Sequence, residues 1–292
     1  MRHDRLAIIT VATLLGFGSV TSAGRPRTFE YSWIEVEDAL TTTAFGINAG
    51  GDIVGSYVDS DGAVHGYRLR GGAFTTIDFP GAAGSLARGI GPGGDIVGGY
   101  WLPGEPAPNE HGFLLTRQGV FLPVDVPGHI STIAQRILPD GTILGCRHDT
   151  DTMHTMRGVV ISGAGVEEIA AHASMHNGAT PDMRRIAGLF TNMATGRTEG
   201  YVVDDGVFTP FVVPGSLMTA AWDVNPLGEV VGVYRDAAGF HGFVLGSDGY
   251  SFLDVPGAAA TRAFGTNSRG DVVGTFVLGG KTRGFLARRT VP

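Results

Sequence analysis

The sequence predicts an all-β fold, and within that class a six-bladed β-propeller with four-stranded blades. Three observations predict it: a glycine-rich composition, a strand motif that recurs six times, and an N-terminal segment that matches the strand missing from the last repeat. The chain has 292 residues, of which 43% are hydrophobic and 47 are glycine. So much glycine excludes helical bundles and coiled coils, and the 16 Phe and 7 Tyr residues exclude a disordered or collagen-like chain.

A hydrophobic pair followed by glycine marks the second strand of each repeat. The copies lie about 43 residues apart, which is the period of a four-stranded propeller blade, whereas leucine-rich and hexapeptide solenoids have shorter periods. Because the glycine recurs in every copy, we expect neighbouring blades to approach too closely there for a side chain. The six copies are Ile53-Val54-Gly55, Ile96-Val97-Gly98, Ile143-Leu144-Gly145, Ile186-Ala187-Gly188, Val230-Val231-Gly232 and Val272-Val273-Gly274.

A third strand follows in each repeat, and a fourth ends most of them. With an inner strand such as residues 44–48, each unit then holds four strand-sized pieces. Fourth strands with a Pro-Gly turn end at residues 81, 128 and 257. The third strands start at His65-Gly66-Tyr67, His111-Gly112-Phe113, Arg157-Gly158-Val159, Glu199-Gly200-Tyr201, His241-Gly242-Phe243 and Arg283-Gly284-Phe285.

The two ends of the repeat region predict how the ring closes. The last repeat stops near residues 285–287 and has no fourth strand of its own. Near the start of the chain, residues 31–36 read Tyr-Ser-Trp-Ile-Glu-Val and match the Phe-Thr-Thr-Ile-Asp-Phe of residues 74–79 position by position. Pairing this segment with the last blade would remove an exposed sheet edge. We therefore expect the strand around Trp33 to close the ring.

These units resemble the bacterial extracellular repeat family called HAF, named after a His-Ala-Phe tripeptide. The resemblance is carried by the His-Gly-Phe and His-Gly-Tyr tripeptides, the Gly-Ile-Asn of residues 46–48, the Ile-Val-Gly-x-Tyr of residues 53–57 and the Thr-Ile-Asp-x-Pro-Gly-Ala of residues 76–82. It spans roughly residues 30–287 and is clearest in copies 1, 2, 5 and 6. The resemblance implies secretion and a repeat architecture, and it implies no activity.

The N-terminus predicts export. Residues 1–23 have a basic start, a mostly apolar run over residues 6–17 and small residues at 21–23, the pattern of a secretory signal peptide. The mature chain, residues 24–292, then forms a single propeller domain without a membrane span. We expect the protein to be secreted or periplasmic.

Charge and cysteine content narrow the choice of partners and stabilising bonds. The chain carries 28 Asp and Glu against 21 Lys and Arg, a net charge of −7. It therefore offers no basic field for nucleic acid, and a neutral or cationic ligand is favoured. Cys146 is the single cysteine, so no disulfide can form within the chain.

The loops predict which face carries the function. Because strands alternate in direction, turns after the first and third strands lie at one end of the ring, and the other two connections lie at the opposite end. The first kind, such as residues 48–52 and 70–72, is short and uniform. The second kind varies, with long departures at residues 102–110 and 146–154. We expect a binding site on this second face, around the central channel.

Polar, aromatic and guanidinium side chains at aligned inner-strand positions or beside them predict the site itself. Such groups converging on one concavity are typical of a site that orients a ligand. The ligand would be a small molecule, a glycan or a protein. The candidate ligand-binding residues are Arg88, Gln135, Asn177, Arg184, Trp222, Asp223 and Arg262.

An enzyme in the same funnel is the alternative. Histidine with an arginine anchor suits a lyase, isomerase or hydrolase acting on a carboxylated or sugar-like substrate. Together with Asp149, His148, His172 and His176 also suit a divalent metal ion, and metal-assisted chemistry is part of this alternative. No cofactor is predicted otherwise. The candidate catalytic residues are Arg136, His148, His172 and His176.

Three further histidines recur at one place in the repeat. Because they recur, we interpret His65, His111 and His241 as structural residues that pack or hydrogen-bond between blades.

Overall fold

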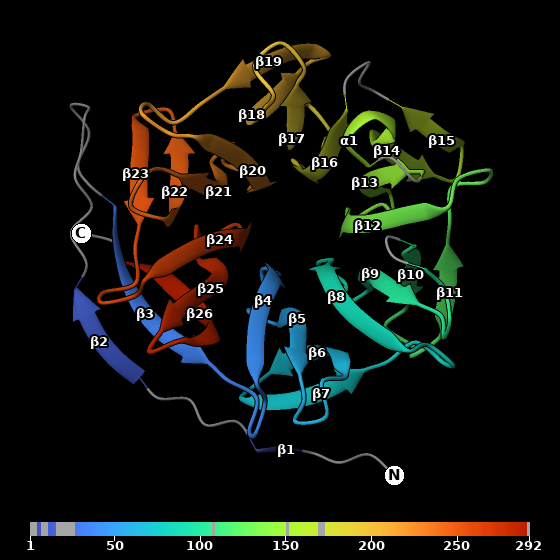
Figure 1. The fold of residues 1–292 in the computed structure, drawn as a ribbon, viewed down its shortest axis with the longest axis horizontal. Helices are drawn as coiled ribbons and strands as arrows, with labels where there is room; N and C mark the ends of the chain where they lie inside the picture. Colours follow the sequence, from blue (N-terminus) through green and yellow to red (C-terminus); the bar gives the residue numbers. More distant parts are fainter. Residues whose placement is uncertain are drawn as a thin grey trace.

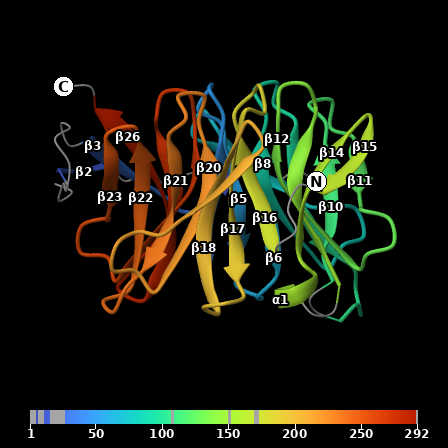
Figure 2. The same ribbon diagram turned by 90° about the horizontal axis from the view of Figure 1, so that it is seen from above.

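The described strands form six antiparallel sheets, which stand around a central axis as the blades of a propeller (Figure 1). The predicted all-β, six-bladed architecture with four-stranded blades is therefore confirmed. In the side view the strands run between the two ends of the ring, with helix α1 at the lower end and the C-terminal end of β26 at the upper end (Figure 2). The computed structural model describes residues 27–106, 109–149, 152–168 and 173–290, and the backbone of residues 5–6 and 11–15.

In blades 1 to 3 each strand pairs with the next along the chain, from the inner strand outward. Tight turns make this possible: Gly71 and Gly72 both have positive φ between the third and fourth strands of blade 1. The strands are β4 (Thr41–Ile47), β5 (Ile53–Val58), β6 (Val64–Arg70) and β7 (Ala73–Ile77) in blade 1; β8 (Gly84–Ile90), β9 (Ile96–Trp101), β10 (His111–Leu115) and β11 (Phe121–Val124) in blade 2; and β12 (Ser131–Ile137), β13 (Ile143–His148), β14 (Arg157–Ser162) and β15 (Gly165–Glu168) in blade 3.

Blades 4 and 5 repeat this order, and blade 6 combines three C-terminal strands with one strand from the start of the chain. The strands are β16 (Ser174–Ala179), β17 (Arg185–Asn192), β18 (Arg197–Asp204) and β19 (Val207–Phe211) in blade 4; β20 (Met218–Val224), β21 (Val230–Arg235), β22 (Phe240–Gly246) and β23 (Gly249–Leu253) in blade 5; and β24 (Ala260–Thr266), β25 (Val272–Leu278), β26 (Lys281–Thr290) and β3 (Thr28–Ile34) in blade 6.

Three short elements lie outside this scheme. Helix α1 (Thr152–Thr155) follows β13, and no helix in the described part of the chain is long and apolar enough to cross a membrane. Strand β1 (Arg5–Leu6) pairs with β7, and β2 (Val11–Leu15) pairs with β3. These two strands fall within the predicted signal peptide, and the rest of that segment lies outside the described residues.

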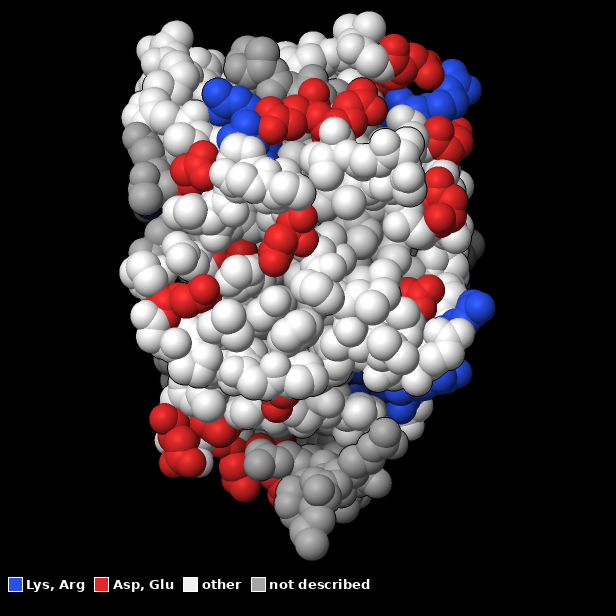
Figure 3. Space-filling view, turned by 90° about the vertical axis from the view of Figure 1, so that its right-hand side faces the viewer, with Lys and Arg blue, Asp and Glu red and all other residues white. Residues whose placement is uncertain are grey.

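The side of the ring shown in Figure 3 is acidic, in keeping with the net charge. On this side, acidic side chains outnumber Lys and Arg, which are few and scattered over a mostly uncharged surface.

The ring closes as predicted. Strand β3 pairs antiparallel with β26 from Ile34 opposite Gly284 to Thr28 opposite Thr290. Trp33 lies 5.4 Å from the ring of Phe276 and belongs to the hydrophobic core of blade 6. The segment therefore contributes both a strand and core side chains to the last blade.

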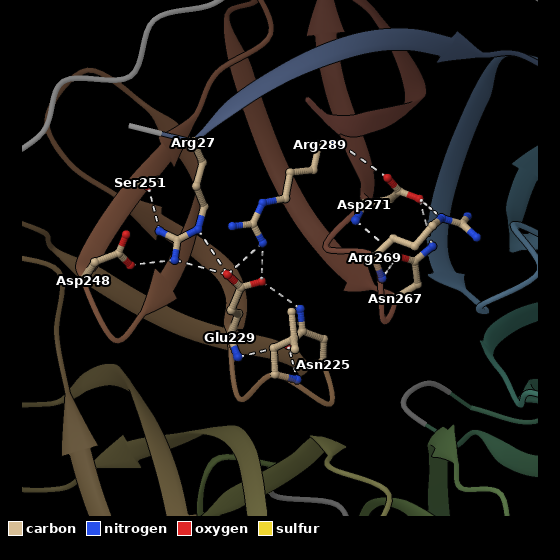
Figure 4. A network of polar contacts seen from close by, with 10 residues as sticks. Arg27, Asn225, Glu229, Asp248, Ser251, Asn267, Arg269, Asp271 and Arg289 are labelled. Atoms are coloured by element: carbon tan, nitrogen blue, oxygen red, sulfur yellow. Dashed lines mark hydrogen bonds and ion pairs between the residues drawn. The ribbon is translucent and has the colours of Figure 1, made fainter. Parts of the chain in front are cut away.

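A polar network beside this seam ties both ends of the propeller to blade 5 (Figure 4). Arg27, just before β3, donates to Glu229 at 3.2 Å and to Asp248 at 2.6 Å. Arg289, near the end of β26, donates to the same Glu229 carboxylate at 3.1 Å. Because Glu229 is only 8% exposed, its carboxylate is shielded from water while it holds two guanidinium groups.

The recurring glycine of the second strand has a different cause from the one predicted. A Cβ at Gly55 would overlap the carbonyl oxygen of Thr43, which lies on the inner strand of the same blade. Neighbouring blades meet instead at the glycine of the third strand. A Cβ at Gly66 would lie 3.1 Å from the backbone nitrogen of Ala87 in blade 2. The expectation of contact between blades at the second-strand glycine was therefore wrong.

The connections between blades are more uniform than predicted. In the turn after β7, Ala82 N–H donates to the Phe79 carbonyl at 3.1 Å, and Ser85 Oγ accepts from Phe79 N–H at 2.9 Å. The same pair of bonds recurs before β4, β12, β20 and β24, with threonine in place of Ser85. These five connections between blades thus share one turn, whereas the connection from blade 3 to blade 4 lies partly outside the described residues. We call the end of the ring that carries the connections between blades and the loops after the second strands the variable-loop face, and the opposite end the short-turn face.

The seam generates a prediction about stability. Glu229→Gln removes the buried carboxylate that Arg27 and Arg289 share. Among the described residues Arg27 then keeps only the Asp248 carboxylate, and Arg289 loses its carboxylate partner. We expect a loss of about 3 kcal/mol in the free energy of unfolding. Asp205→Asn is the matched control, because its ion pair with Arg184 is exposed and is worth less than about 1 kcal/mol. Urea unfolding of both variants measures the difference. Equal losses in the two variants would show that the seam network does not hold the ring closed.

Candidate functional site

Every inner strand contains a β-bulge at the same register, and the bulged residue faces the central channel. In blade 2, for example, the pairing of β8 with β9 shifts between Ala87 and Gly89, which leaves Arg88 unpaired. Such a bulge re-aims a side chain. Because Ala87 is buried between blades, its neighbours along the strand point to the channel side. The bulged residues are Phe45, Arg88, Gln135, Asn177, Trp222 and Phe264.

Four of the predicted ligand-binding residues, Arg88, Gln135, Asn177 and Trp222, therefore share one level of the channel. Aromatic residues complete the level. The ring of Phe264 lies 5.4 Å from that of Phe45 and 5.2 Å from that of Trp222. Blades 5, 6 and 1 thus present an aromatic arc, and blades 2, 3 and 4 present a polar arc opposite it.

The polar arc holds two hydrogen-bond acceptors that no described residue satisfies. Asn177 donates from Nδ2 to the Ala221 carbonyl at 2.7 Å, but its Oδ1 has no partner in the described part of the chain. The same holds for Oε1 of Gln135. Both side chains are almost fully buried, at 0% and 1% exposed. Buried polar atoms are nearly always bonded, so these two point to a missing donor.

Arg136, the residue after one of these bulges, blocks the channel. Its two terminal nitrogens donate four hydrogen bonds, to the carbonyl oxygens of four bulged residues in four different blades. Its Nε lies 3.2 Å from Oδ2 of Asp223 in blade 5. The four carbonyls belong to Phe45, Arg88, Gln135 and Phe264, at distances of 3.1, 2.9, 2.9 and 2.7 Å.

Asp223 is the counterion of Arg136, and we call this pair of side chains the plug. Its carboxylate also accepts hydrogen bonds from the backbone N–H groups of Thr266 and Val224, at 3.0 and 2.9 Å. Burial raises the pKa of Asp223, and the Arg136 charge opposes that rise. Arg136 and Asp223 are thus engaged with one another and with backbone groups, which gives both a structural role. Their contact with a substrate or ligand stays a prediction.

A small pocket opens on the other side of the plug. It has a volume of about 110 Å³, with Arg136 and Asp223 at its base, and it lies at the short-turn face. Its walls are apolar, so it differs in chemistry from the mixed aromatic and polar ring. The wall residues include Ile47, Ile90, Pro92, Ile137, Leu138, Pro139, Pro181, Val224 and Pro226.

Arg184 and Arg262 lie apart from the bulged residues. Arg184 is on the short-turn face, where it makes two 3.0 Å hydrogen bonds to Asp205 in the open, so it does not join the channel ring. Arg262 lies on β24 two residues before Phe264, on the same side of the strand. Its guanidinium stacks 3.9 Å from the ring centroid of Phe240.

His176 is enclosed between blades 3 and 4. It stands where the other inner strands have alanine, and its ring packs against Gly158 of blade 3. Tyr201 donates to the Met175 carbonyl at 2.9 Å, so its hydroxyl accepts a hydrogen bond from Nδ1–H of His176. The buried Nε2 is then unprotonated and has no partner among the described residues. Burial lowers the pKa of His176 to about 4.

Of the other predicted catalytic histidines, His148 is not brought to His176. His148 is 4% exposed at the end of β13, and its Nδ1 lies 3.2 Å from the Asp149 carbonyl oxygen. The Asp149 carboxylate faces His129 instead, at 3.2 Å. His172 lies outside the described residues. Within the residues described, no three His, Cys, Asp or Glu side chains gather closely enough to hold a metal ion.

The recurring histidines make their contacts within one blade, and not between blades as predicted. His65 stacks on Tyr57 at 5.0 Å, and its two nitrogens lie 3.0 and 3.2 Å from carboxylate oxygens of Asp78 and Asp59. The same arrangement recurs in blades 2 and 5. The other two sets are His111 with Tyr100, Glu105 and Asp125, and His241 with Tyr234, Asp236 and Asp254.

Sequence reasoning missed four residues of the candidate site: Phe45, Phe264, Phe240 and Arg235. Phe264 shares an Ala-Phe-Gly tripeptide with Phe45, so it looked like a repeat residue with a structural role. Arg235 lies 5.9 Å from the Phe240 ring and ends the second strand of blade 5. The second strands of blades 1 and 6 have valine at the position of Arg235. The sequence alone therefore showed that blade 5 departs from the repeat here.

No family of known proteins matches this chain, and neither does any curated protein. Solved propellers do. They include a putative TolB from Agrobacterium tumefaciens, 13% identical with a TM-score of 0.52 over 100% of both chains. An oligogalacturonate lyase from Vibrio parahaemolyticus is 12% identical, with a TM-score of 0.52 over 97% of this chain and 98% of that one. The propeller domain of the Trilobed protease from Pyrococcus furiosus is 9% identical, with a TM-score of 0.54 over 86% and 94%. These similarities establish the fold.

The enclosed histidine generates a prediction about pH. An unfolded chain protonates His176 near pH 6.5, whereas the folded protein holds it neutral down to about pH 4. The neutral His176 therefore costs no unfolding free energy above pH 6.5. As the pH falls below 6.5 the unfolded chain takes up a proton that the folded protein does not, and the unfolding free energy drops by on the order of 3 kcal/mol at pH 4. His176→Ala, which installs the residue of the other five blades, should flatten the fall in unfolding free energy between pH 6.5 and 4.5. An unchanged pH profile would mean that this histidine is not held neutral.

Proposed function

We propose that this protein is an exported propeller that binds a small-molecule, glycan or protein ligand at the central channel, from the variable-loop face. One observation carries the proposal: an aromatic arc lies opposite a polar arc that contains two buried acceptors without a partner among the described residues. The predicted signal peptide and the resemblance to HAF repeats support a secreted or periplasmic location. The TolB structures among the similar folds are compatible with that location.

The two arcs provide complementary contacts for one ligand. The rings of Trp222 and Phe264 offer an apolar surface on which a ligand ring stacks. The free oxygens of Gln135 and Asn177 accept from ligand hydroxyl or amine groups. Arg136 closes the far side, so the ligand enters and leaves by the variable-loop face.

Binding is favoured over acid-base catalysis by the state of His176 and Arg136, two of the four predicted catalytic residues. His176 is neutral and packed between blades, with one nitrogen bonded to Tyr201 and the other facing Gly158. Arg136 is bound to backbone carbonyls and Asp223. A general acid or base must reach the reacting atom, and these groups face the protein.

A binding screen tests the proposal. We expect a panel of mono- and oligosaccharides, amino acids and short peptides to yield a ligand that raises the thermal midpoint of the protein. Trp222→Ala should weaken binding of that ligand at least tenfold in isothermal titration calorimetry, because the aromatic arc loses its largest, partly exposed ring. Arg184→Gln, on the opposite face, should bind like the wild type. A ligand that Trp222→Ala binds with full affinity, or that Arg184→Gln fails to bind, would place the site elsewhere.

A further inference from the structure

Arg262 is a charged side chain at a register of the inner strands that is otherwise uncharged. It lies on β24 just before the buried Ala263 and two residues before the bulged Phe264. Because β24 runs from the variable-loop face toward the short-turn face, Arg262 is closer to the variable-loop face than the bulged residues are. The residues at the same register in the other five blades carry no charge. They are Thr43, Leu86, Ile133, Met175 and Ala220.

No described carboxylate neutralises Arg262. The nearby Arg235, which flanks the same Phe240 ring, likewise has no ion pair among the described residues. The acids of this part of blade 5, Asp236 and Asp254, are held by His241 at 3.3 and 2.9 Å. Two guanidinium groups thus flank one aromatic ring without an anion, in a protein whose net charge is −7.

Other partly buried arginines of the channel and the seam have a carboxylate partner, which Arg262 lacks among the described residues. Arg88 binds Glu110 through three hydrogen bonds of 3.0 to 3.2 Å. Arg283 lies over the ring of Trp33, as Arg262 lies over Phe240, and it has Glu35 at 2.9 Å. Burial lowers the pKa of Arg262, the direction expected for a guanidinium without an anion. The place of the carboxylate is therefore left to a ligand.

We propose that Arg262, assisted by Arg235, binds the carboxylate of an acidic sugar in the channel. The proposal rests on the proposed function and deepens it by naming the ligand class. A planar guanidinium matches a carboxylate through two parallel hydrogen bonds. Sugar hydroxyls supply the donors that Gln135 Oε1 and Asn177 Oδ1 lack. The apolar face of the sugar ring packs on Trp222 and Phe264.

A matched pair of probes tests the carboxylate. Methyl β-D-glucuronide and methyl β-D-glucoside differ by a carboxylate in place of a hydroxymethyl group. We expect the wild-type protein to bind the glucuronide roughly tenfold or more tightly than the glucoside in isothermal titration calorimetry. Arg262→Gln should remove this preference. Arg262→Lys should keep part of it, because lysine retains the charge and loses the planar fork.

Arg184→Gln is the control variant, since it removes one arginine of the short-turn face by the same substitution. It should keep the full preference for the glucuronide. Equal binding of the two sugars by the wild type would overturn the carboxylate contact and leave the channel site itself standing. A preference that survives in Arg262→Gln, or no glucuronide binding by the folded wild type at millimolar concentration, would also overturn it. Failure of the proposed function would appear separately, as full affinity for the screened ligand in Trp222→Ala.

Discussion

The guanidinium of Arg136 is the contact on which the centre of this propeller depends. Four of the six bulges turn the backbone carbonyl of an inner strand toward the Arg136 guanidinium, where water has little access, and a buried carbonyl requires a donor. One planar group with several N–H donors meets these four carbonyls at once, and Asp223 balances its charge. Where blade 3 has Arg136 after its bulge, blades 1, 2 and 6 have glycine. A side chain would not fit there, because a Cβ at Gly89 or Gly265 would lie 2.6 Å from a carbonyl oxygen of the next inner strand.

The plug also determines what the two ends of the channel can do. On the short-turn side it forms the base of a small apolar pocket, and on the variable-loop side it lies below the ring of bulged side chains. Because every bulge occurs at one register, six different side chains meet at one level while the blades keep a common backbone. The fold can therefore vary its ligand chemistry at these positions without altering the contacts between blades.

Much of the architecture could be predicted because it follows from short sequence patterns that recur along the chain. The period identified the blades, and the match between residues 31–36 and 74–79 identified the closing strand. Alignment of the copies also placed Arg88 and Trp222 at one level. The role of Arg136 could not be predicted in this way, because a bulge adds one residue and shifts every later side chain to another side. Treating recurrence as a sign of structure concealed Phe264, and pairing of His65 with Asp78 depends on strand register across the blade.

The central claim is that the planar fork of Arg136, and not only its charge, holds the inner strands together. Urea unfolding of Arg136→Lys beside Arg136→Met tests it most directly. Lysine keeps the attraction to Asp223 but cannot reach carbonyls in four blades, so we expect Arg136→Lys to lose at least about 3 kcal/mol of unfolding free energy, close to the loss in Arg136→Met. An Arg136→Lys protein with wild-type stability would contradict the account.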